Sequence, residues 1–155
     1  MNQRENMMKI IGVASLSILF AVSTVIAGFT LKSGVYRMNR LDAAKSEALS
    51  GRKAVAFLYS DENTFCTQCG SASLQAIETL AGSCVVVYVD KADATKLPEQ
   101  VQNALRSAKA GKYIPVIVVM NYDLKQVIAI VPYARGESYK KLLSEAKENI
   151  LSHRK

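Results

Sequence analysis

Two cysteines, Cys66 and Cys69, are separated by two residues at the point where a strand pattern gives way to a helical one. The run 54–59 is short, apolar and rich in strand formers, and the turn-forming residues 60–63 follow it. After the pair, apolar residues recur at helical spacing, at Ala72, Ala76, Ile77 and Leu80. The pair therefore lies between a predicted strand and the beginning of a predicted helix, which restricts the fold more than any other feature.

Strand and helix patterns alternate along the rest of the chain. A continuous apolar, β-branched run at 84–89 predicts a strand buried on both faces, as in a parallel sheet. A strand, a crossover helix and a second strand predict parallel pairing, and a closing hairpin adds antiparallel strands. We therefore expect an α/β fold with a central mixed sheet flanked by helices. The other expected elements are a helix from Leu41 that stops at Gly51, a helix after Pro98 that ends at Gly111, a strand at 116–120, a tight turn at 121–123, a strand at 126–131 and a final helix at 137–152.

The start of a helix gives the cysteine pair a chemical use. Backbone N–H groups are unpaired there and create a positive potential, which favours a thiolate at Cys66 and lowers its pKa. Cys66 would attack the disulfide of another molecule, and Cys69, one turn deeper, would resolve the mixed disulfide. Two other interpretations stay open. One is a static disulfide or an inactive binding module, and the other is half of a zinc site, for which only Cys84 and His153 remain as ligands.

The motif Phe65-Cys66-Thr67-Gln68-Cys69 after a strand, the segment Tyr113-Ile114-Pro115-Val116 before the closing hairpin, and the order of elements resemble the thioredoxin superfamily. The resemblance covers residues 41–152, and the pair and the proline lie about 46 residues apart. It implies a thioredoxin fold with catalytic residues Cys66 and Cys69, flanked in the motif by Phe65, Thr67 and Gln68. It also implies that Pro115 is cis and faces the pair, while Ile114 offers backbone hydrogen bonds to a substrate peptide.

Three features differ from thioredoxin itself. The residue before the first cysteine is Phe65 rather than Trp, and the loop 60–65 is slightly longer. The strand 54–59 has no acidic residue to serve as the family's buried proton acceptor. Asp61 and Glu62 are candidates for that role, although loop carboxylates are usually solvated. Since neither His nor Pro stands between the cysteines, the sequence does not indicate whether the protein reduces, oxidises or isomerises disulfides.

An uncharged segment at 10–31 precedes this domain and is long enough to cross a bilayer. We expect a short basic N-terminus at 1–9, a transmembrane anchor or signal segment at 10–31, a linker at 32–40 and a thioredoxin-like domain at 41–155. The layout is typical of export, so we expect a single-pass membrane protein with its domain outside the cytoplasm. Cleavage near Ala27, giving a secreted protein, is the alternative. The Lys and Arg residues nearest the two ends slightly favour the opposite orientation.

The net charge of +7 is spread along the chain and does not indicate a nucleic-acid partner. Its densest part interleaves with apolar residues near the C-terminus, as on the solvated face of an amphipathic helix. No nucleotide, haem or metal motif is visible, so we expect no cofactor beyond the redox-active Cys66–Cys69 disulfide. Cys84 begins a buried strand and is expected to pack as a small hydrophobe, with a regulatory or intermolecular thiol as the alternative.

These observations predict a thiol–disulfide oxidoreductase that acts on protein thiols and disulfides at the extracytoplasmic face of a membrane. Its redox partner is not indicated by the sequence. The alternative is a non-catalytic thioredoxin-like module, an accessory part of a membrane secretion, conjugation or bacteriocin-export system. A cytoplasm-facing anchored protein that feeds electrons to membrane partners is a third interpretation.

Overall fold

The computed structural model describes residues 34–154. The predicted basic N-terminus at 1–9 and the predicted membrane or signal segment at 10–31 lie outside this range. Within the described part, none of the helices is both long and apolar enough to cross a bilayer. The helices and strands are β1 (Val35–Arg37), α1 (Leu41–Gly51), β2 (Val55–Ser60), α2 (Thr67–Leu80), β3 (Val85–Asp90), α3 (Glu99–Arg106), β4 (Val116–Met120), β5 (Val127–Val131) and α4 (Glu137–Ser152).

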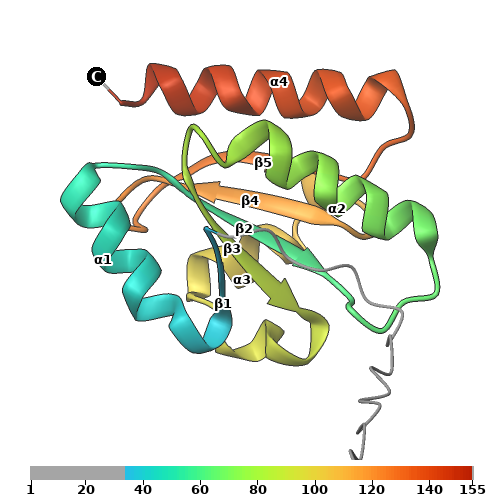
Figure 1. Ribbon diagram of the computed structural model, residues 1–155, viewed down its shortest axis with the longest axis horizontal. Helices are drawn as coiled ribbons and strands as arrows, with labels where there is room; N and C mark the ends of the chain where they lie inside the picture. The colour runs from blue at the N-terminus through green and yellow to red at the C-terminus, as the bar shows by residue number, and fades with distance from the viewer. Residues whose placement is uncertain (1–33, 155) are drawn as a thin grey trace, which may run out of the picture.

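The strands form one mixed sheet in the order β1-β3-β2-β4-β5. β3 runs parallel to its neighbours β1 and β2, whereas β4 is antiparallel to β2 and β5 is antiparallel to β4. Helices α2 and α4 cover one face of the sheet, and α1 and α3 cover the other (Figure 1). Residues 85–89 of β3 are buried, as the continuous apolar run predicts. The expected mixed sheet flanked by helices is confirmed.

Successive side chains of β2 point to opposite faces of the sheet, so the core has two parts. Ala56 and Leu58 belong to a buried cluster with residues of α2 and α4. Their neighbours Val55 and Phe57 belong to a second cluster, with residues of α1 and α3. Because both faces of β2 are buried, its position is fixed from both sides. The loop that follows β2 therefore begins at a fixed position in the core.

The register of the strands brings three chain segments together at one end of the sheet. Ser60, the last residue of β2, pairs with Asp90, the last residue of β3. Tyr59 pairs with Val116, the first residue of β4. The loop that leaves β2 and the loop that enters β4 therefore lie side by side. Helix α2 begins at the end of the first of these loops.

The structure differs from the sequence-based expectations in three places. β1 lies within the segment expected to be a linker, and its three residues are too few to show a period. Helix α3 ends at Arg106, not at Gly111, because a separate 3₁₀ turn (Ala108–Ala110) fills the interval. The expected tight turn after β4 is a longer loop, in which the Asn121 side chain accepts hydrogen bonds from two backbone N–H groups and Leu124 takes a positive φ of 59°.

Candidate active site

The cysteine pair forms the beginning of α2. Cys66 is the N-cap residue, with extended backbone angles, and its sulfur accepts a hydrogen bond from the Cys69 N–H at 3.2 Å. The two sulfurs form a disulfide, and the Cα atoms are 5.3 Å apart. The Cys66 sulfur therefore occupies the place that a Ser or Asp oxygen takes in an ordinary N-cap. The predicted position of the pair, between strand and helix, is confirmed.

Exposure distinguishes the two cysteines. Cys66 is exposed, whereas Cys69 is only 9% exposed. A disulfide of another polypeptide can therefore approach Cys66, while Cys69 is screened by the protein around it. This asymmetry fits the order of attack expected from the sequence, in which Cys66 acts first.

The segment before β4 has the backbone form that the resemblance implies. The Ile114–Pro115 peptide bond is cis. Pro115 is buried and Ile114 is half-buried, directly before the strand whose first residue pairs with Tyr59. The sheet thus brings Pro115 to the same end as the cysteine loop. Contact of Ile114 and Pro115 with a substrate peptide stays a prediction.

Two large aromatic side chains project from the loops at this end of the sheet. Phe65, directly before Cys66, is 97% exposed, and Tyr113, two residues before Pro115, is 72% exposed. Folding normally buries such side chains, so their exposure beside both motifs indicates a surface suited to contact with another polypeptide. Both residues belong to the motifs that carry the resemblance, but their exposure was not predicted from the sequence.

Buried hydroxyl groups lie beside Cys69. Ser60 and Ser73 are both fully buried. The Ser73 hydroxyl donates to the Cys69 carbonyl at 2.9 Å and lies 3.3 Å from the Ser60 oxygen. Burial also raises the pKa of the Tyr88 hydroxyl. Neutral hydroxyls thus lie next to Cys69, at the end of the strand in which the resemblance implies a buried carboxylate. Sequence reasoning missed them, since Ser60 resembled a turn residue.

The loop carboxylates considered as proton acceptors have structural partners instead. Glu62 forms an ion pair with Arg37, and its backbone N–H donates to the Asp90 carboxylate at 3.0 Å. Asp61 accepts from the Asn63 N–H at 2.9 Å. These contacts hold the long loop between β2 and α2 against β1 and β3. They give the two carboxylates a role in positioning the cysteine loop.

The third cysteine is separate from the pair. Cys84 is a free thiol, 5% exposed, and donates to the Leu80 carbonyl at 3.4 Å. Burial raises the pKa of this thiol to about 12. It is therefore protonated and shielded at neutral pH, in agreement with the expected packing role. Among residues 34–154, no group of three or more His, Cys, Asp or Glu side chains is arranged to hold a metal ion.

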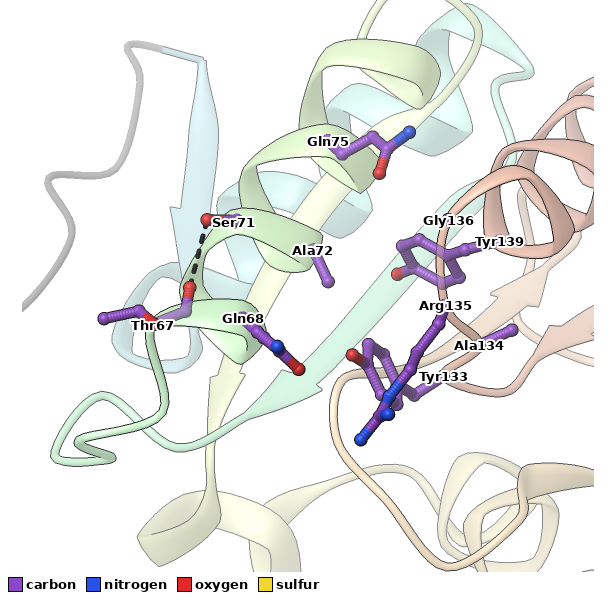
Figure 2. A pocket seen from close by; sticks show the side chains of 10 residues that line it. All are labelled: Thr67, Gln68, Ser71, Ala72, Gln75, Tyr133, Ala134, Arg135, Gly136 and Tyr139. Carbon is purple, nitrogen blue, oxygen red and sulfur yellow. Dashed lines mark hydrogen bonds between the residues drawn. The ribbon is translucent and has the colours of Figure 1, made fainter.

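A groove of about 320 Å³ adjoins the motif (Figure 2). Thr67 and Gln68, the two residues between the cysteines, form one end of its α2 wall. The segment that joins β5 to α4 forms the opposite wall, with Tyr133 and Arg135. Figure 2 shows Gln68 and Tyr133 pointing toward one another across the opening. We call this the motif-side groove.

Solved thioredoxin structures share this architecture. A thioredoxin h mutant from poplar matches with a TM-score of 0.54 and 14% identity, over 83% of this chain and 97% of that one. The wild-type poplar thioredoxin h matches with a TM-score of 0.50 and 18% identity, over 72% and 95%. A thioredoxin from Nicotiana alata matches with a TM-score of 0.50 and 14% identity, over 82% and 98%.

The chain therefore has the thioredoxin fold, and the resemblance seen in its motifs is confirmed at the level of the fold. At these identities the similarity defines architecture and not substrate. No known protein-family model matches the sequence, and no curated protein is significantly similar to it.

Burial of Cys84 predicts a pH dependence of stability. The thiol has an ordinary pKa of 9.0 when unfolded and about 12 when folded, so the folded state keeps a proton that the unfolded chain releases. The resulting stabilisation is complete below pH 9 and is lost as the pH rises toward 12. We predict that the stability difference between the wild type and Cys84→Ala shrinks above pH 9, by up to about 1.4 kcal/mol per pH unit.

Urea unfolding of the two oxidised proteins at a series of pH values measures this difference. Keeping the Cys66–Cys69 disulfide intact removes the other two thiols from the titration. A difference that stays constant from neutral pH into the alkaline range would show that Cys84 titrates equally in both states.

Proposed function

We propose that this protein is a thiol–disulfide oxidoreductase that exchanges disulfides with polypeptide substrates through Cys66 and Cys69. The observation that carries the proposal is the exposed Cys66 sulfur at the N-cap of α2, bonded to a screened partner one turn deeper. The helix N-terminus stabilises negative charge on that sulfur, both when it attacks and when it leaves. The exposed Phe65 and Tyr113 supply a surface for a polypeptide partner.

The exchange takes place in two substitutions at sulfur. In the reduced protein, the Cys66 thiolate attacks a substrate disulfide, forms a mixed disulfide and releases the other substrate sulfur as a thiolate. The Cys69 thiol loses its proton to solvent and attacks the Cys66 sulfur, which releases the second substrate thiolate and closes the Cys66–Cys69 disulfide. The released thiolates take up protons from water, and two electrons pass to the substrate. The same steps in reverse oxidise a substrate dithiol.

The neutral surroundings of Cys69 affect the second substitution. Ser60 and Ser73 offer hydroxyl groups, which donate and accept hydrogen bonds but do not take up the Cys69 proton at neutral pH. The resolving step therefore depends on the thiolate fraction of Cys69 itself. We expect the mixed disulfide to persist longer at low pH than it does in a protein with a buried carboxylate base.

Cysteine variants test the proposal in a peptide-disulfide exchange assay with the full chain in detergent. We expect Cys66→Ala to reduce exchange to the level of a variant without cysteines, because the attacking sulfur is gone. Cys69→Ala should attack and then stall, with the peptide trapped on Cys66 and visible by mass spectrometry. Cys84→Ala is the matched control and should retain exchange, because Cys84 is buried away from the pair.

Exchange by the wild type no faster than by the cysteine-free variant contradicts the proposal. In cells, a Cys66→Ser and Cys69→Ser double variant that keeps full function favours the alternative, a non-catalytic accessory module. Trapping of the peptide on Cys69 in the Cys66→Ala variant, with no trapping in Cys69→Ala, would reverse the assigned order of attack.

We also propose that residues 10–31 hold the domain at a membrane, outside the cytoplasm. The support is the uncharged segment itself, with its short basic N-terminus. In intact, mildly reduced cells we expect a membrane-impermeant maleimide to label Cys66, which is exposed. The Cys66→Ser and Cys69→Ser double variant should stay unlabelled, because only buried Cys84 remains. Labelling that requires cell lysis would place the domain in the cytoplasm.

A further inference from the structure

The motif-side groove lies beside the start of α2, where the cysteine pair is found. Its volume of about 320 Å³ lies at the lower end of the usual range for ligand pockets. Thr67 follows Cys66 directly in the chain and lines the groove together with Gln68. A polypeptide held on Cys66 by a mixed disulfide is therefore attached next to a residue of the groove wall.

The lining of the groove is polar and carries one positive charge. Of its lining residues, all of which lie within 34–154, Arg135 alone is charged. Its guanidinium has no ion-pair partner among the described residues, whereas the neighbouring Glu137 and Lys140 pair with each other at 2.5 Å. Gln68 and Gln75 add amide groups on the α2 wall. The groove thus offers hydrogen-bond donors and an unneutralised cation.

The wall that carries Arg135 is held in place by packing. Tyr133 lies against Tyr139 of α4, with ring centroids 5.9 Å apart. Tyr139 is buried at the base of α4, so this contact ties the segment before α4 to the core. Figure 2 shows Arg135 projecting from the same segment as Tyr133. The Arg135 guanidinium therefore extends from a segment that packs against the core, on the wall of the groove opposite α2.

A carboxylate is the group that this arrangement fits best. The planar guanidinium donates a matched pair of hydrogen bonds to a carboxylate, which a point charge such as Lys cannot do. The groove wall includes Thr67, which follows Cys66, so a side chain close in sequence to the reactive cysteine of a substrate can reach the groove. We propose that Arg135 selects polypeptide substrates that carry Asp or Glu close in sequence to the reactive cysteine.

This inference rests on the proposed function, because it names the substrates of the same site. Arg135 acts on specificity and does not take part in the chemistry at sulfur. Glutathione also carries carboxylates beside a cysteine, so the test must separate a polypeptide from this small thiol.

Two peptides that differ only in Glu or Gln next to a cysteine provide the test. Each is activated as a 2-pyridyl disulfide, so attack by Cys66 of the reduced full chain forms the mixed disulfide and releases thiopyridone. We expect the wild type to react about three- to tenfold faster with the Glu peptide at low salt, and less selectively at high salt. Arg135→Gln should bring the rate ratio close to one, and Arg135→Glu should invert it.

Lys147→Gln is the matched control, since it removes one positive charge from α4 outside the groove. It should keep the wild-type ratio. The inference is overturned if the wild type does not distinguish the peptides, if Arg135→Gln keeps the preference, or if Lys147→Gln abolishes it equally. It is also overturned if Arg135→Gln slows only the reaction with glutathione disulfide. Failure of the proposed function gives a different result: neither peptide then reacts faster with the wild type than with the cysteine-free chain.

Discussion

A sulfur atom caps the first turn of α2. In most helices an oxygen of Ser, Thr, Asp or Asn accepts the free N–H groups at this point. Here the Cys69 N–H donates to the Cys66 sulfur, so the field of the helix end acts on the atom that performs the chemistry. The rest of the structure leaves Cys66 exposed to solvent and packs Cys69 against the core.

The support comes from the sheet and from the loop between β2 and α2. β2 is buried on both faces and ends next to the last residue of β3 and the first residue of β4. The loop is fixed by the Arg37–Glu62 ion pair and by the bond from the Glu62 N–H to Asp90. As a result, Cys66 faces solvent while Cys69 is held against buried hydroxyl groups. This difference in environment assigns different roles to two chemically identical side chains.

Sequence patterns predicted the parts of the fold that repeat over several residues. The strands β2, β3 and β4 are continuous apolar runs, and the helical spacing that follows the cysteine pair indicated α2. β1 could not be predicted, because three residues show no period. Ser60 and Ser73 come from different elements, and only tertiary packing brings their hydroxyls together. Arg135 lies in a connecting segment without periodicity, so its place opposite Gln68 is visible only in the structure.

The pH dependence of alkylation tests the central claim most directly. The reduced chain is treated with iodoacetamide at a series of pH values, and the products at Cys66 and Cys69 are separated by peptide mass mapping. We predict that Cys66 reacts faster, with a midpoint below 9.0, the ordinary pKa of a cysteine thiol. Equal rates at the two cysteines, or a Cys66 midpoint at or above that value, would show that the helix end does not activate the sulfur it carries.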